Sequence, residues 1–95
     1  MTKLQLQLAF DLALARVERL LGSDMKTAKG ASARAQLEKL EKELKQERAL
    51  ALERQTVDRE WLQRTVRWVV EWVPDKELAL LAALGGIARA TPPGS

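Results

Sequence analysis

The sequence contains no histidine, cysteine, tyrosine or asparagine. Without histidine and cysteine, the chain has no imidazole base, no thiol nucleophile, no disulfide and none of the usual ligands of structural zinc. A Ser–His–Asp arrangement cannot be assembled from these residues, and a serine–lysine variant needs a pocket that the sequence does not reveal. We therefore expect a protein that is not an enzyme and that uses no metal or other cofactor.

Proline and glycine are also scarce, with 3 and 5 residues, and the β-branched residues are too few for a protein built on sheets. Leucine, alanine, glutamate, arginine and lysine together make up more than half of the 95 residues. That composition is typical of long helices and coiled coils. The sequence therefore predicts an all-α protein.

A membrane-spanning helix needs about 20 consecutive apolar residues, and the longest nearly uninterrupted apolar run, 78–88, is much shorter. Polar residues interrupt the apolar stretch near the start of the chain, which argues against a signal peptide. The lack of cysteine fits a reducing compartment. We expect a cytoplasmic protein with no membrane partner.

The periodicity of apolar residues predicts a single helical domain, 1–90, with helices at 3–21, 33–73 and 75–88. A polar connector, 22–32, separates the first two helices, and 91–95 is expected to be a flexible tail. Leucine or another apolar residue occupies nearly every second position of the first segment, a pattern typical of a strand, but the residue types of this segment favour a helix. Leu4, Leu8 and Leu12 form a second, narrower stripe on that helix.

The second segment contains no glycine or proline between Ser32, a plausible N-cap, and Val73. At 100° per residue, one apolar seam runs along its whole length. A straight helix over about 32–73 would extend about 63 Å. It would form the long central helix of a coiled-coil-like helical hairpin or bundle, flanked by the two shorter antiparallel helices. A break near Thr56 would make the alignment of the seam a coincidence.

A second apolar stripe appears only in the C-terminal half of this segment and contains all three tryptophans. On the three-helix arrangement it is left uncovered, which predicts an interface formed with a second copy, a dimer being favoured, or with another protein. The alternative is that the stripe belongs to the core of one chain. The Trp stripe, as we call it below, consists of Leu50, Val57, Trp61, Trp68 and Trp72.

The net charge of +3 is spread along the chain, except around Lys26, Lys29 and Arg34, which have no acidic neighbour. These residues predict, as the alternative function, weak phosphate contacts in a sequence-independent nucleic-acid-binding or packaging accessory protein. Glu43 and Glu47, four residues apart on the long helix, have the spacing to share a proton or a hard cation. They lie in a strongly charged segment and are expected to face solvent.

Overall fold

The structure is a computed structural model that describes residues 3–23 and 25–90. Within these residues it contains four α-helices and one turn of 3-10 helix at Asp75–Glu77. The all-α prediction is confirmed, and the tail expected at 91–95 lies outside the described residues. The α-helices are α1 (Lys3–Leu21), α2 (Arg34–Arg54), α3 (Arg59–Trp72) and α4 (Ala79–Ala90).

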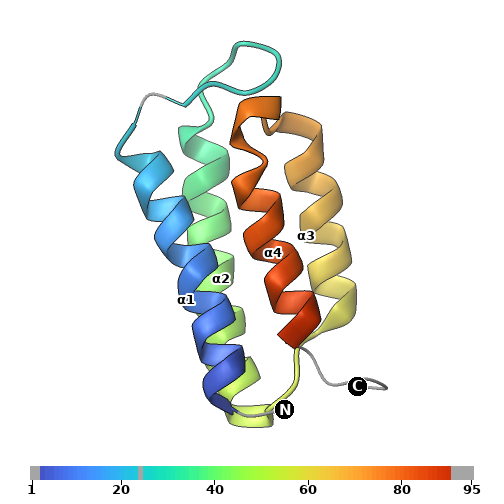
Figure 1. Cartoon of the computed structure of the whole chain (residues 1–95). Helices are drawn as coiled ribbons and strands as arrows, with labels where there is room; N and C mark the ends of the chain where they lie inside the picture. Colours follow the sequence, from blue (N-terminus) through green and yellow to red (C-terminus); the bar gives the residue numbers. More distant parts are fainter. Residues whose placement is uncertain (1–2, 24, 91–95) are drawn as a thin grey trace.

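The helices form an up-and-down bundle in which each helix runs opposite to the one before it (Figure 1). The backbone of α1 lies close to both α2 and α4, and that of α3 lies close to α4. The molecule measures 39 × 22 × 18 Å. The prediction of an unbroken helix over about 33–73 is therefore wrong, because this segment forms two antiparallel helices.

The break between α2 and α3 has a local cause. Gln55, at the C-cap of α2, adopts left-handed backbone angles, φ 58° and ψ 29°. Two β-branched residues, Thr56 and Val57, follow it in the sequence, and such residues are poor helix formers. The carboxylate of Asp58 then accepts a hydrogen bond from the backbone N–H of Trp61, at 3.2 Å, and so caps α3.

The core is filled from all four helices, by the faces that the periodicity selects within each helix. Helix α1 contributes Phe10 and Val17, which are fully buried together with their neighbours on the same face. The apolar seam of the sequence is buried on both sides of the break, although the two helices run in opposite directions. Its buried members are Ala33, Leu37, Leu40, Leu44, Ala51, Leu62, Val69 and Val73.

The last helix differs from the predicted range 75–88. Asp75–Glu77 forms the 3-10 turn, and α4 runs from Ala79 to Ala90 through Gly85 and Gly86. Glycine in a helix interior costs about 1 kcal/mol relative to alanine. Burial of the large side chains on the inner face of α4 offsets that cost; these are Leu80, Leu84 and Ile87.

Candidate binding surfaces

Most of the Trp stripe lies inside the bundle. Val57, Trp61 and Trp72 are at most 6% exposed, whereas Leu50 and Trp68 are half-buried. The ring of Trp61 stacks on that of Phe10, with centroids 6.5 Å apart. The expectation that the stripe is left uncovered is therefore wrong for these three residues. The break turns α3 back into the bundle, where Trp61 reaches Phe10 on α1 and Glu43 on α2.

Trp68 is the member of the stripe that stands between the core and the surface. Its ring meets that of Trp72 edge to face, at a centroid distance of 5.3 Å. The ammonium of Lys39, on α2, lies 5.1 Å from the centroid of Trp68. These contacts on two sides restrict the ring, so that Trp68 forms a fixed wall rather than a freely rotating surface side chain.

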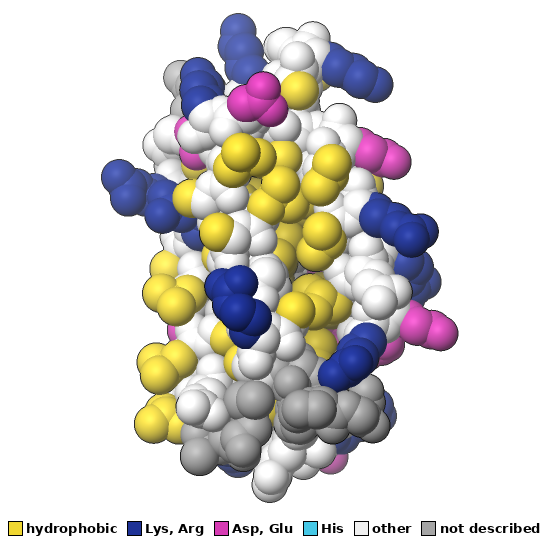
Figure 2. Space-filling model, turned by 45° about the vertical axis from the view of Figure 1, so that its right-hand side comes forward, with side chains coloured by type: hydrophobic (Ala, Val, Ile, Leu, Met, Phe, Trp, Pro, Cys, Tyr) yellow, Lys and Arg dark blue, Asp and Glu magenta, His cyan; other side chains and the backbone are white. Residues whose placement is uncertain are grey.

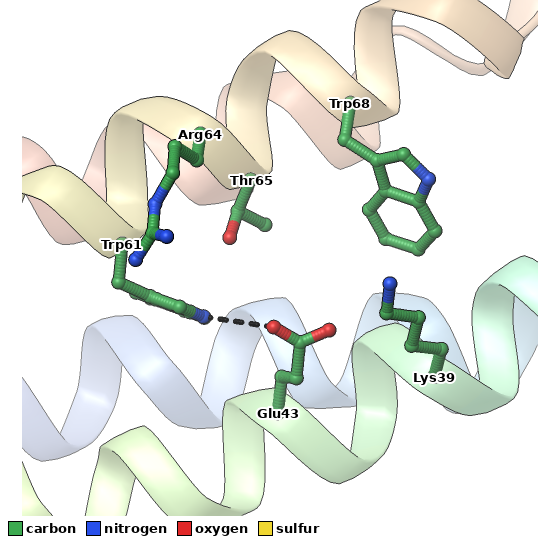
Figure 3. Close-up of a pocket in the computed structure, with 6 residues that line it drawn as sticks. All are labelled: Lys39, Glu43, Trp61, Arg64, Thr65 and Trp68. Atoms are coloured by element: carbon green, nitrogen blue, oxygen red, sulfur yellow. Dashed lines mark hydrogen bonds between the residues drawn. The ribbon is translucent and has the colours of Figure 1, made fainter.

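A hollow of about 300 Å³ lies between α2 and α3, bounded at its two ends by the indoles of Trp61 and Trp68 (Figure 3). Lys39 and Glu43 come from α2, whereas the remaining residues are on α3. The tryptophans are seven positions apart, two helical turns, which puts both rings on one side of α3. The hollow is lined by Lys39, Glu43, Trp61, Arg64, Thr65 and Trp68.

The polar groups of this hollow are only partly used within the chain. The indole Nε1–H of Trp61 donates a hydrogen bond to Glu43 Oε1, at 3.2 Å, and no described residue bonds to Oε2. Thr65 is 5% exposed. Its hydroxyl points into the hollow without a hydrogen-bond partner among the described residues (Figure 3). The hollow thus offers an acceptor and a hydroxyl beside two indoles.

The carboxylates near the hollow are not simply exposed to solvent, as the sequence had led us to expect. Glu43 and Glu47 are both half-buried. Burial, followed by the negative charges of Asp58 and Glu43, raises the pKa of Glu47 above its ordinary value of 4.5. Among the described residues, no group of three or more carboxylates is arranged to hold a metal ion.

The outer face of α1 carries three large apolar side chains that are exposed. Leu4, Leu8 and Leu12 are 60%, 53% and 67% exposed. Figure 2 shows hydrophobic side chains protruding along the edge of the molecule where α1 runs, and a second strip over α3 and α4. Two other exposed large hydrophobic side chains are Val70, on α3, and Leu78, just before α4.

A groove of about 480 Å³ adjoins this row of leucines, between α1 and α4. Leu8 and Leu12 form part of one wall, and the far side is made largely of small residues on α4. The row and the groove therefore belong to one continuous face, which we call the α1/α4 face. The residues of α4 in the groove are Ala82, Ala83, Gly86, Arg89 and Ala90.

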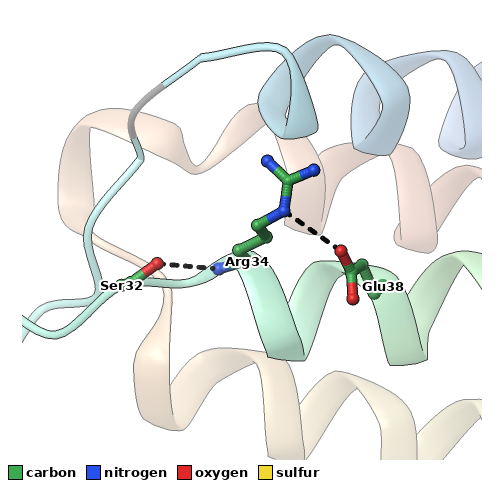
Figure 4. Close-up of polar contacts among 3 residues, drawn as sticks. All are labelled: Ser32, Arg34 and Glu38. Atoms are coloured by element: carbon green, nitrogen blue, oxygen red, sulfur yellow. Dashed lines mark hydrogen bonds and ion pairs between the residues drawn. The ribbon is translucent and has the colours of Figure 1, made fainter.

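The basic connector lies at one end of the bundle. Lys26 and Lys29 are exposed, and Lys26 pairs with Ser32 in an isolated antiparallel bridge. Arg34 is not a free cation, because its Nε lies 3.1 Å from Glu38 Oε1 in an ion pair (Figure 4). Its backbone N–H donates to the hydroxyl of Ser32, at 3.4 Å. Phosphate binding by this connector stays a prediction.

The hollow between α2 and α3 could not be found by reading along the chain. Its residues come from two helices, and the register between them depends on the turn at 55–58. The repeated spacing of tryptophans was a signal, but it pointed to an interface rather than to a pocket wall. The leucine row on α1, in contrast, is visible in the sequence because it lies on a single helix.

Fold and surfaces together define a small helical bundle with an apolar outer face and a mixed polar and aromatic hollow. Comparisons with protein families, with curated proteins and with solved structures found no match. No helix in the described ranges is both long enough and apolar enough to cross a membrane.

Proposed function

We propose that this protein is a non-catalytic helical module that associates with a second copy of itself through the α1/α4 face. The observation that carries the proposal is the row of Leu4, Leu8 and Leu12, each more than half exposed, beside a groove lined by small side chains. Because each leucine is already partly covered, removing its exposed part from water contributes about 1–2 kcal/mol. A row of three such side chains on one helix favours association.

A second copy fits this face better than an unrelated surface does, because the face contains both a ridge and a groove. A two-fold interface uses the same patch on both partners, so the patch must be complementary to itself. The leucine row is the ridge, and the adjoining small residues, such as Ala83 and Gly86, leave room for the ridge of the partner. Ridges packed into grooves are the ordinary geometry of helix contacts.

The size of the face also suits a dimer. A stable interface buries about 800 Å² on each partner, which is roughly an eighth of the 6030 Å² that this chain exposes. Two adjacent helices, one of them 19 residues long, offer a face about 28 Å long and about 20 Å wide. That footprint of about 560 Å² covers most of the area that an ordinary interface buries and is close to the size of a weaker, transient one.

The proposal also includes two predictions made from the sequence, that the protein is not an enzyme and that it is cytoplasmic. A chain without histidine or cysteine lacks the commonest bases and nucleophiles, which supports a binding role rather than catalysis. The absence of cysteine also supports the cytoplasm as its compartment, since the fold needs no oxidising environment.

The test is the mass of the protein in solution, measured by sedimentation equilibrium over a wide range of concentrations. We expect the unmodified chain to have twice the mass of one chain at high concentration and to dissociate on dilution. Leu8→Glu puts a charge in the middle of the row and should raise the dissociation constant about 100-fold or more.

Val70→Glu is the matched control, because Val70 is similarly exposed, at 55%, but lies on α3 outside the α1/α4 face. It should leave the dissociation constant within about threefold, a difference of less than 1 kcal/mol. Circular dichroism checks that both variants remain helical. A monomer at every concentration, or a dimer sensitive to Val70→Glu and not to Leu8→Glu, would overturn the proposal.

A further inference from the structure

We propose that the hollow between α2 and α3 binds a nucleotide, that is, a planar base carrying a phosphate. This inference does not depend on self-association, because the hollow shares no lining residue with the α1/α4 face. Its volume of about 300 Å³ is at the lower end of the range for small-molecule sites. Its lining combines aromatic, hydrogen-bonding and cationic side chains, and each kind favours one part of a nucleotide.

The two indoles favour a flat ring. Trp61 is held by its stacking on Phe10 and by its bond to Glu43, and Trp68 is held by its edge contact with Trp72. Both walls are therefore ordered before a ligand arrives, which lowers the entropy lost on binding. Aromatic side chains bind bases by stacking and edge contacts, with little dependence on the base.

The polar groups between the indoles favour a ring with hydrogen-bond donors. Glu43 Oε2 has no partner among the described residues, and an ionised carboxylate only accepts hydrogen bonds. The hydroxyl of Thr65, a residue that is 5% exposed, points into the hollow and both donates and accepts. The ring nitrogens and amino groups of a base supply the complementary donors and acceptors, which a purely hydrocarbon ring lacks.

The charges at the rim favour an anionic substituent. Arg64 lies at the Trp61 end and Lys39 at the Trp68 end, so that a phosphate leaving the hollow in either direction meets a cation (Figure 3). Both side chains are exposed, and neither is in an ion pair among the described residues. Arg64 Nε donates to the backbone carbonyl of Glu60, at 3.3 Å, and the Lys39 ammonium lies over the Trp68 ring, so each cation keeps further N–H donors for a phosphate. With one carboxylate against two cations, the lining carries a net positive charge, which disfavours a cationic ligand.

The experiment follows the three indole N–H signals by NMR while adenosine monophosphate is added. We expect the signals of Trp61 and Trp68 to shift saturably, and that of Trp72, which does not line the hollow, to shift less. At about 10 mM nucleotide, a site of millimolar affinity is nearly saturated. No shift of the Trp61 and Trp68 signals at that concentration would overturn the proposal.

Adenosine and inorganic phosphate, each added alone, separate the two parts of the ligand. Adenosine should bind about tenfold more weakly than the nucleotide, because it lacks the charge-assisted bond at the rim. Equal affinity for adenosine, or the same shifts with phosphate alone, would contradict a site that needs both parts. A single strand of polyadenylate tests whether the natural ligand is a free nucleotide or a nucleic acid. Tighter binding per nucleotide than adenosine monophosphate shows would identify single-stranded nucleic acid, and equal or weaker binding would identify the free nucleotide.

Two substitutions test the lining. Lys39→Gln removes a rim cation and Thr65→Val removes the hydroxyl at nearly constant volume; each should weaken nucleotide binding about fivefold to tenfold. Lys42→Gln is the matched control, since Lys42 is an exposed lysine of α2 that does not line the hollow. If Thr65→Val perturbs the fold, the exposed Lys39 still provides the test, and equal weakening by Lys42→Gln would refute a specific site.

Discussion

Two buried tryptophans of α3 differ in what their indole N–H groups meet. That of Trp61 donates to Glu43, at 3.2 Å. That of Trp72 is buried without a partner among the described residues, although the buried Oε1 of Gln36 on α2 also has none. A buried donor without a partner costs about 1–3 kcal/mol. The folded protein therefore bears a penalty at Trp72 that it avoids at Trp61.

This difference predicts how the two positions respond to phenylalanine. Both Trp61→Phe and Trp72→Phe remove buried ring volume, but only the first breaks a hydrogen bond and only the second removes an unpaired donor. We expect Trp72→Phe to lower the free energy of unfolding by about 1 kcal/mol less than Trp61→Phe does. Urea denaturation measures both, with the slope of the transition as a check that the unfolded states are alike. Equal losses of unfolding free energy in the two variants would contradict a paired indole N–H at Trp61 and an unpaired one at Trp72.

The raised pKa of Glu47 predicts how the stability of the protein depends on pH. Since the pKa is higher in the folded protein than in the unfolded chain, its contribution to stability is complete below the ordinary value of 4.5 and is lost as pH rises through the folded value. Near neutral pH, Glu47→Gln should therefore stabilise the protein. Relief of the repulsion from Glu43 alone contributes about 0.2–0.5 kcal/mol.

The measurement for Glu47 is the free energy of unfolding as a function of pH, for the unmodified chain and the variant. The gain from Glu47→Gln should be largest at neutral pH and should shrink as pH falls toward 4.5. Glu53→Gln, an exposed change on the same helix, is the control and should have little effect. A gain that grows as pH falls would mean that the pKa is lowered.

At the scale of the helix, the turn between α2 and α3 decides the architecture. The apolar seam continues across the break at nearly the same helical angle, so periodicity alone cannot detect the end of α2. The signals that mark it are chemical: Thr56 and Val57 are poor helix formers, and Asp58 is a good N-cap. The Trp stripe also begins near the turn, which indicates that a different helix face is buried after the turn than before it.

The left-handed conformation of Gln55, with φ 58°, yields a prediction for this turn. A residue with a side chain pays about 1–2 kcal/mol there, whereas glycine does not. Part of the gain is offset by the greater freedom of glycine in the unfolded chain. Gln55→Gly should stabilise the protein by about 0.5–1 kcal/mol. Thermal unfolding measures it, with Arg54→Gly, one residue earlier and still helical, expected to destabilise instead.

The sequence pattern predicts which residues share a face of one helix, but not which helices pack against each other. The range of α1, its buried face around Phe10 and its exposed leucine row all follow from one periodic pattern on one element. The burial of Trp61 and Trp72 did not follow, because it depends on which helix lies opposite α3. The same reason hides the hollow, whose lining is set by the register of α2 against α3.

At the scale of the whole molecule, the two proposed surfaces lie on opposite sides of the bundle. α1 and α4 form one side, and α2 and α3 form the other (Figure 1). A dimer formed through the α1/α4 face therefore leaves the hollow of each copy open. Substitution of Leu8 should leave nucleotide binding unchanged, and substitution of Lys39 should leave the mass in solution unchanged.

Self-association also predicts how stability depends on protein concentration. A chain of 95 residues buries a limited core, and burying Leu4, Leu8 and Leu12 in a dimer adds to it. Because only the folded chain dimerises, the midpoint of thermal unfolding should rise with concentration. A tenfold increase shifts the dimer equilibrium by about 1.4 kcal/mol, or about 0.7 kcal/mol per chain. That corresponds to roughly 3–5 °C for a domain of this size.

Calorimetry at several protein concentrations measures this shift, which Leu8→Glu should abolish and Val70→Glu should leave intact. If the unfolding midpoint of the unmodified chain does not change with protein concentration, the leucine row stays exposed to solvent and self-association through it is contradicted.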